Sequence, residues 1–284
     1  MKKKYIYPIL LCVMSCMSCS DMLDIPKDGR IPFEDIFKDR HKTRGYLNSC
    51  FAQTEDIRPD FDFASYCDEA QNAEVVRPGR PYSRWYGGQA TSTWFPVPTA
   101  GIWDNMYEGI RKCNVFLANI DEATIIASEE EINKWKAQAF TLRALYFWEL
   151  IKRYGGGPIV LNEIPIGSDL SGYKRATFNE CVKVIMNDCD SALAMPTRHF
   201  PYYNGSQTTG MMTKAVCHAI KSQAILYAVS PQWNDGTYSW NDAAKITKTA
   251  VDSLSANYEL YNRAPAADVA QNSYALFHIS TADV

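Results

Sequence analysis

The sequence is poor in the side chains that hold metal ions. Its 284 residues include only four histidines, and these share no zinc-ligand spacing with the six cysteines that follow the N-terminal leader. The six cysteines also lack C-x-x-C spacing, which structural zinc sites commonly use. The sequence therefore predicts no metal site and no cofactor. The histidines are His41, His199, His218 and His278, and the cysteines are Cys50, Cys67, Cys113, Cys181, Cys189 and Cys217.

Long apolar runs and basic runs are also missing. Beyond the leader, no apolar run approaches the roughly 20 residues that a membrane-spanning helix needs. The formal net charge is −3. It becomes −6 without residues 1–18, because that segment holds three lysines and no acid. No strongly basic run remains, so nucleic acid is not an expected partner.

The sequence has none of the common catalytic motifs. The patterns G-x-S-x-G and H-E-x-x-H and the phosphate-binding P-loop are absent, and we predict no enzyme. Three consecutive acids, Glu129, Glu130 and Glu131, fall in the first turn of a predicted helix. Negative charge there is favourable to the helix dipole, so we assign these acids no catalytic role.

Residues 1–18 predict a lipoprotein signal peptide. Three lysines are followed by a mostly apolar stretch that ends at residue 17 and is too short to cross a membrane. Small residues precede Cys16 and Cys19, and an acidic stretch follows Cys19, as at a bacterial lipid-attachment site. We predict lipidation of Cys19, with Cys16 as the alternative and a plain secretory signal as a second alternative. Several acyl chains would anchor the protein stably.

The rest of the chain predicts a mainly all-α fold. After an extended tether over residues 19–32, apolar residues recur at three- and four-residue steps. Capping boxes are expected at Ser128 with Glu131 and at Thr177 with Glu180. Successive helices suggest tetratricopeptide-like hairpins in an α-solenoid, although a strict 34-residue repeat is absent. The predicted helices cover residues 33–53, 102–121, 128–154, 177–196, 210–229 and 240–257.

Several large or sulfur-containing side chains are predicted to be structural. Trp103, Trp135 and Trp148 lie on helical apolar stripes and are expected in the core. Residues 128–154 are apolar on two faces, as in a helix packed between neighbours. Cys181 and Cys189 would lie about 12 Å apart by helical rise, too far for a disulfide. The thiols are expected to pack as small apolar groups.

Residues 55–101 form a long irregular segment that is rich in proline, glycine and aromatic residues. An irregular segment of this length in a compact domain is usually functional or disordered, and this one is too aromatic for disorder. Flat rings can stack on sugar faces, and arginine or glutamine can reach hydroxyl groups. The alternative is that the rings fix the segment to the helices. The predicted ligand contacts are Arg80, Arg84, Trp85, Tyr86, Gln89 and Trp94.

Four stretches together resemble the SusD/RagB family of outer-membrane nutrient-binding lipoproteins. The first is residues 19–26, Cys-Ser-Asp-Met-Leu-Asp-Ile-Pro. The second is residues 103–117, which begin Trp-Asp-Asn-Met-Tyr-Glu-Gly-Ile-Arg. The third, residues 137–158, ends Arg-Tyr-Gly-Gly-Gly-Pro and is close to the family's most recognisable segment. The fourth is residues 214–231, which end Leu-Tyr-Ala-Val-Ser-Pro.

The resemblance implies a location, a ligand and a partner. It implies a tetratricopeptide-like scaffold of residues 33–284, lipid-anchored on the outer face of a Gram-negative outer membrane. The ligand would be an oligosaccharide or polysaccharide, or less often a peptide. The partner would be a SusC-like TonB-dependent transporter, to which the captured nutrient is delivered without chemistry.

Three other interpretations remain open at the level of sequence. The chain is shorter than the family pattern and stops without a closing helix, so we expect it to be an incomplete, N-terminal part of a longer protein. A helical scaffold that binds only a protein partner, or a truncated remnant without function, is the alternative. A surface glycosidase is a further class, although no motif supports it.

Overall fold

The computed structural model describes residues 33–57, 91, 102–165, 167–203, 210–260 and 276–278. The chain divides into two compact units, Met1–Ile36 and Phe37–Val284. In the first unit, the described residues form the short 3-10 helix η1 (Phe33–Asp35). The second unit holds all the other elements.

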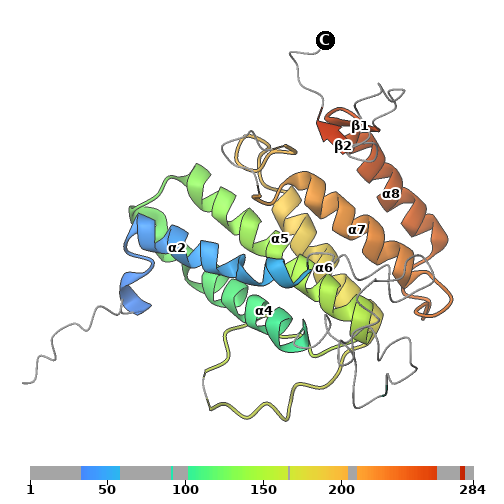
Figure 1. Ribbon diagram of the computed structural model, residues 1–284, viewed down its shortest axis with the longest axis horizontal. Helices are drawn as coiled ribbons and strands as arrows, with labels where there is room; N and C mark the ends of the chain where they lie inside the picture. The colour runs from blue at the N-terminus through green and yellow to red at the C-terminus, as the bar shows by residue number, and fades with distance from the viewer. Residues whose placement is uncertain are drawn as a thin grey trace, which may run out of the picture. The chain divides into compact units, whose positions relative to one another are not determined.

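The second unit is built almost entirely from helices, as predicted. The elements are α2 (Arg40–Cys50), η2 (Ala52–Ile57), α4 (Ile102–Asn119), η5 (Ile120–Ile125), α5 (Glu129–Tyr154), α6 (Phe178–Leu193), α7 (Lys214–Ala228), α8 (Trp240–Leu254), β1 (Tyr258–Leu260) and β2 (Leu276–His278). Each long helix from α4 to α8 packs against the next one along the chain (Figure 1), which confirms the tetratricopeptide-like arrangement. Strands β1 and β2 form a short antiparallel pair in which Glu259 lies opposite Phe277.

Helix α5 is the central helix of this unit. It packs against α2, α4, α6 and α7, and side chains on two faces of it are completely buried, including Leu142 and Phe147. The two apolar stripes in its sequence therefore serve two different sets of neighbours, as predicted. It ends at Gly155, whose positive φ of 76° suits glycine.

Two of the three tryptophans predicted in the core are there. Trp135 and Trp148 are 3% and 2% exposed, and the indole nitrogen of Trp148 donates to Gln223 Oε1 at 3.0 Å. The prediction for Trp103 was wrong, because this side chain is only half-buried. It lies in the first turn of α4, where a neighbouring segment leaves a cleft beside it.

The prediction of one helix over residues 33–53 was also wrong. The segment divides into η1, α2 and η2. Asp39 causes the break before α2, because its backbone is extended (φ −131°, ψ 125°) and its carboxylate accepts a hydrogen bond from Lys42 N. An N-cap of this kind starts a new helix and stops the preceding segment from continuing into it.

Helix starts follow the predicted capping chemistry with two exceptions. The Thr177–Glu180 capping box is complete, and Ser239 with Asp242 forms another. At α5 only half of the predicted box forms: Ser128 accepts from Glu131 N, while the Glu131 carboxylate accepts from Arg40 instead. Helix α7 starts at Lys214 rather than residue 210 and has no side-chain cap at Thr213.

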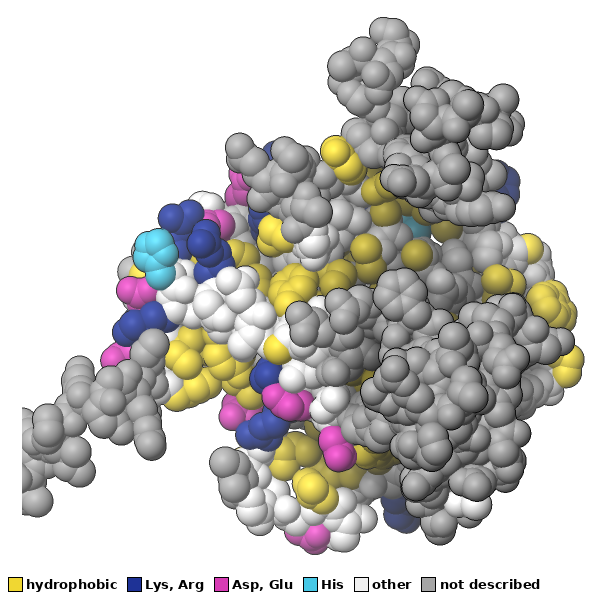
Figure 2. Space-filling model, viewed as in Figure 1, with side chains coloured by type: hydrophobic (Ala, Val, Ile, Leu, Met, Phe, Trp, Pro, Cys, Tyr) yellow, Lys and Arg dark blue, Asp and Glu magenta, His cyan; other side chains and the backbone are white. Residues whose placement is uncertain are grey.

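The space-filling view shows charged side chains gathered over the start of α2 (Figure 2). This helix is drawn in blue in Figure 1. The cluster is not a continuous basic surface, because Glu131 lies 2.6 Å from the Arg40 guanidinium within it.

Among the helices in the described ranges, none combines the length and the apolar character that crossing a bilayer needs.

Candidate functional site

A cleft of about 480 Å³ lies between the first half of α4 and the segment that connects α5 to α6. Most of its surface is apolar, and its rim carries polar side chains. Pockets that bind small molecules commonly combine apolar and aromatic walls with a few polar groups. The lining residues are Trp103, Tyr107, Ile110 and Arg111 of α4, and Pro158, Val160, Asn162, Ile164, Pro165, Gly167, Ser168, Leu170 and Tyr173 of the connecting segment.

Aromatic rings form one wall of the cleft. The indole of Trp103 packs against Tyr107, with ring centroids 5.0 Å apart, and meets Tyr154 edge-on at 5.2 Å. The Tyr107 hydroxyl donates to the Pro158 carbonyl at 2.8 Å, and burial raises the pKa of Tyr107 well above its usual range. Tyr173 stands on the opposite segment and is 41% exposed. The cleft therefore offers one ring held in place by others and one ring open to solvent.

The polar groups of the cleft lie at its rim. The Arg111 guanidinium donates to the Ile164 carbonyl at 2.6 Å, which fixes the side chain across the cleft while leaving it exposed. Asn162 is exposed on the opposite side. Donors and acceptors of this kind can bind hydroxyl groups of a ligand whose flat face rests on an aromatic ring.

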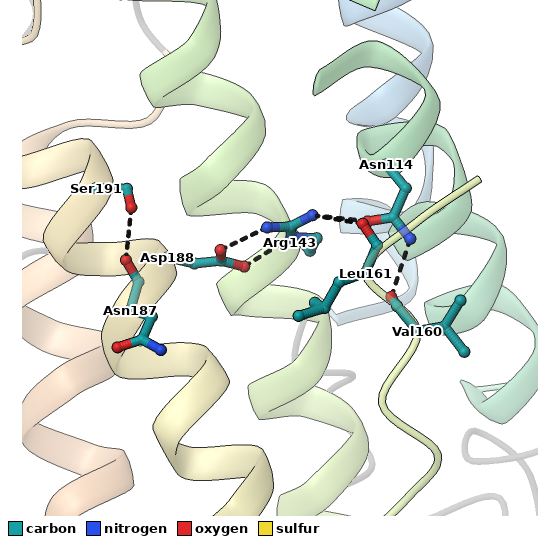
Figure 3. A network of polar contacts seen from close by, with 7 residues as sticks. All are labelled: Asn114, Arg143, Val160, Leu161, Asn187, Asp188 and Ser191. Atoms are coloured by element: carbon teal, nitrogen blue, oxygen red, sulfur yellow. Dashed lines mark hydrogen bonds and ion pairs between the residues drawn. The ribbon is translucent and has the colours of Figure 1, made fainter. Parts of the chain in front are cut away.

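A buried polar network holds the wall that carries Val160, Leu161 and Asn162. The Asn114 amide donates to the Val160 carbonyl at 2.9 Å and, more weakly, to the Asn162 carbonyl at 3.4 Å. Arg143 donates to the Asn114 side-chain oxygen at 2.8 Å and to the Leu161 carbonyl at 3.4 Å. In Figure 3 these groups point toward one another from α4, α5 and the extended segment. The segment has no regular secondary structure here, so side chains satisfy its backbone carbonyls.

The glycines at 155–157 allow the connecting segment to pack closely against its neighbours directly after the end of α5. A side chain on Gly156 would lie 1.7 Å from the Ala176 carbonyl oxygen, and one on Gly157 would lie 2.9 Å from the Tyr107 hydroxyl. Arg175 then donates to the carbonyl oxygens of Tyr154 and Gly156. The backbone next to the cleft can therefore pack this closely only because Gly156 and Gly157 have no side chain.

The structure does not describe the residues that the sequence predicted for the site. Lipidation sites Cys16 and Cys19 lie outside the described residues, and so do all six predicted ligand contacts, namely Arg80, Arg84, Trp85, Tyr86, Gln89 and Trp94. Sequence reasoning missed Tyr107, Tyr173 and Asn162. A usable signal was present in the four-residue spacing of Trp103 and Tyr107 at the start of α4, which places both rings on one helix face.

The acids at the start of α5 lie where the sequence predicted them, in its first turn. Within the ranges that the structure describes, no group of three or more His, Cys, Asp or Glu side chains is arranged to hold a metal ion.

Comparison with known proteins identifies the family. The profile described as "Starch-binding associating with outer membrane", of the SusD-like type, matches residues 63–215, which is more than half of the chain. No curated protein matches the chain.

Solved structures share the fold at low sequence identity. A SusD-like protein from Bacteroides fragilis superposes with a TM-score of 0.62 at 20% identity, over 81% of this chain and 40% of that one. NanU from B. fragilis gives 0.60 at 16% identity, over 83% and 46%. A laminarin-binding SusD-like protein gives 0.55 at 16% identity, over 75% and 43%.

The present chain thus spans less than half the length of these structures, and at such identities they show the fold alone. The family profile covers α4 and α5 and the connecting segment that lines the cleft. The chain belongs to the SusD-like family of starch-binding proteins that associate with the outer membrane.

Proposed function

We propose that this chain is part of a cell-surface lipoprotein that captures an oligosaccharide or polysaccharide and delivers it to a SusC-like TonB-dependent transporter. Membership of a starch-binding family supports the class of ligand. One structural relative is a laminarin-binding SusD-like protein, and this is consistent with a glucan as the ligand. Cys19, or alternatively Cys16, would carry the lipid that holds the protein at the outer membrane.

The observation that carries the proposal is the pairing of aromatic rings and hydrogen-bonding groups around one cleft. Trp103 is held by Tyr107 and Tyr154, so the ring loses little further freedom when a ligand binds. A pre-ordered ring binds more tightly for that reason. Arg111 and Asn162 would reach the sugar hydroxyls. The predicted contacts of the 80–94 segment would add to the same binding function.

The protein would capture and release its ligand without breaking a bond in it. Among the described residues the cleft lining contains no carboxylate, whereas glycoside hydrolysis ordinarily requires a pair of them. Binding is therefore the chemistry that this cleft supports.

Calorimetric titration with maltooligosaccharides and with laminarin tests the proposal. We expect one of these glucans to bind, and the Trp103→Ala variant to bind about tenfold more weakly, because a stacking ring contributes on the order of 1 kcal/mol beyond its buried area. The control is Trp240→Ala, since Trp240 is 60% exposed on α8 and lies outside the cleft. Equal affinities for Trp103→Ala and the unmodified chain would contradict the role of the cleft.

A second candidate function is a scaffold that binds only a protein partner. It is favoured by a mostly apolar groove of about 780 Å³ between α7 and α8, where Val251 is 66% exposed. Apolar surface of this kind commonly marks an interaction site. Co-purification with a transporter, without glucan binding by the complex, would favour this function over glycan capture.

A further inference from the structure

A second hollow, of about 480 Å³, lies beside the start of α6. Its walls come from the end of α5, the first residues of α6 and the loop that joins α7 to α8. Gln232 and Asp235 of that loop and Arg175 before α6 are exposed, whereas Asn179 of α6 is only 1% exposed. The second hollow therefore has a polar, accessible mouth and a buried polar side chain among its walls.

Asn179 has one atom without a hydrogen-bond partner. Its amide nitrogen donates to the Trp233 carbonyl at 2.9 Å and to the Asp235 carboxylate at 2.6 Å, and these two acceptors fix the orientation of the amide. Among the side chains that the structure describes, Asn179 Oδ1 is a buried acceptor to which no group donates. Buried acceptors are nearly always paired, so an exception needs a cause. A ligand hydroxyl that enters the second hollow would supply the missing donor.

Trp233 supplies a flat apolar surface beside this acceptor. Its ring stacks on Phe178, with centroids 4.7 Å apart and planes at 11°, and part of the indole remains exposed. Asn179 also holds the Trp233 backbone through its carbonyl. An ordered ring next to hydrogen-bonding groups is suited to a sugar, which has one apolar face and hydroxyl groups at its edge.

The second hollow and the cleft are neighbours. Tyr154 lines the second hollow and also packs edge-on against Trp103 of the cleft. A side chain on Gly155 would lie 2.9 Å from the tip of the Trp233 indole, and one on Gly157 would lie 3.7 Å from the tip of the Trp103 indole. Two positions of extended chain span only about 7 Å, so the two indole tips lie within about 17 Å of each other. An oligosaccharide of a few units is long enough to cover that distance.

We propose that the second hollow is a further subsite for the glycan that occupies the cleft, so that longer saccharides bind more tightly than short ones. The inference rests on the proposed function, since it extends the same ligand. One sugar unit lies against the Trp233 ring and donates a hydroxyl group to Asn179 Oδ1. The exposed Gln232 side chain reaches another hydroxyl group at the mouth.

The charges around the second hollow favour a neutral ligand. The Arg175 guanidinium and the Asp235 carboxylate both line it and offset each other. The first turn of α6 is closed by the capping box of Thr177 and Glu180, and the Glu180 carboxylate adds negative charge there. The start of α6 is therefore not open to an anion, and an uncharged saccharide fits this site better than an acidic or phosphorylated one.

Calorimetric titration with saccharides of two lengths tests the subsite. Maltotriose and maltoheptaose, and the laminarin oligomers of the same lengths, are titrated into the full chain. We expect the longer member of one pair to bind about tenfold more tightly, as a second stacking ring of ordinary strength would provide. Trp233→Leu keeps an apolar side chain against Phe178 but has no flat ring. It should lose the gain with length and bind the short saccharide unchanged.

The matched control is Trp233→Phe, which keeps a ring on Phe178 and should keep most of the gain. Oxidative footprinting of the unmodified chain gives a second measurement that needs no variant. Hydroxyl radicals oxidise exposed side chains, and mass spectrometry locates the products. The bound longer saccharide should protect Trp233 from oxidation, whereas the bound short saccharide should not.

Three results would overturn the subsite. They are equal affinities for the two lengths, a gain with length that a cooperatively melting Trp233→Leu variant retains, and undiminished oxidation of Trp233 with the longer saccharide bound. In each of these cases a loss of short-saccharide binding in Trp103→Ala would still support the proposed function. Binding of no glucan at all would overturn both proposals.

Discussion

Arg143 on α5 and Asp188 on α6 form a buried, two-bond ion pair. The guanidinium donates from Nε to Oδ2 at 2.8 Å and from Nη2 to Oδ1 at 2.7 Å, and the two side chains are 9% and 6% exposed. Burial raises the pKa of Asp188, and the bonds from Arg143 oppose that rise. Since Arg143 also bonds to Asn114, one side chain couples α4, α5, α6 and the cleft wall.

Removing one partner of this ion pair should strongly destabilise the folded protein. We expect Arg143→Met to lower the free energy of unfolding by about 3–5 kcal/mol, because Asp188 is left charged and unpaired in the interior. Urea unfolding followed by circular dichroism measures the loss. The double variant Arg143→Met/Asp188→Leu should recover most of it, since both charges are then absent.

An exposed ion pair supplies the control for that experiment. Lys248 and Asp252 lie 2.6 Å apart on α8, and their side chains are 74% and 60% exposed. Lys248→Met should change the free energy of unfolding by only about 0–1 kcal/mol, because exposed pairs contribute little. A similar loss for Lys248→Met and Arg143→Met would contradict the structural role of the buried pair.

Two glycines inside helices should respond oppositely to alanine. A side chain on Gly109 would lie 2.6 Å from the Tyr146 ring, whose hydroxyl donates to the Cys50 carbonyl. Gly109→Ala should therefore destabilise the protein by about 1–3 kcal/mol through overpacking. Gly45 on α2 has nothing within 4 Å, and Gly45→Ala should stabilise by about 0.5–1 kcal/mol. Thermal melts of both variants test these two expectations. A higher melting temperature for Gly109→Ala would contradict the overpacking and show that the Tyr146 ring can move aside.

The glycine turn after α5 should be needed for the cleft. Gly156→Ala would bring a methyl group 1.7 Å from the Ala176 carbonyl oxygen. Only a backbone shift relieves that contact, and we expect a loss of stability of about 2 kcal/mol or more together with weaker glucan binding. Gly172→Ala, in open space on the same segment, should leave melting and binding unchanged. If Gly156→Ala is stable and binds glucan as well as the unmodified chain, the glycine turn is not needed for binding in the cleft.

His218 should make stability depend on pH. Burial lowers the pKa of His218 below 6.5, and the nearby charges of Lys221 and Lys214 lower it further, against a weaker opposite effect of Asp190. The folded state therefore prefers the neutral ring. Stability is complete above pH 6.5 and falls as the pH decreases from 6.5 to the lowered value, below which this residue adds no further loss.

Melting temperatures between pH 7.5 and 5 test the role of His218. The variant His218→Phe keeps a flat ring for the stacking contact with Tyr202, whose centroid lies 5.9 Å away, and it cannot titrate. Its melting temperature should decrease less over that range than that of the unmodified chain. Identical slopes for the two proteins would show that other groups cause the pH dependence.

Most of the helical framework was predictable from local chemistry. The capping box at Thr177 and the apolar spacing of α4 and α6 act within a few residues, so the sequence displays them directly. The first helix was predicted poorly, because Phe33 and Ile36 continue the apolar pattern through a point where the Asp39 cap starts a new helix. The capping residue Asp39 is present in the sequence, but the apolar periodicity on both sides of it predicts one continuous helix.

The cleft was not predictable in the same way. Trp103 fits a helical apolar stripe as well as Trp135 does, and only the neighbouring segment decides that one is half-buried and the other enclosed. Glu131 likewise satisfies the capping-box pattern, yet its carboxylate pairs with Arg40, which is 91 positions away. Contacts between distant residues override local preference in both cases.

The sequence alone determined the family, the helical class and the main helix boundaries, because these depend on motifs and on periodicity along a short stretch of chain. The tertiary structure decided which side chains face a cavity and which backbone carbonyls accept hydrogen bonds from Arg143 and Asn114. The physical reason is that burial and hydrogen bonding between helices depend on how separate elements pack, and no local pattern records that packing.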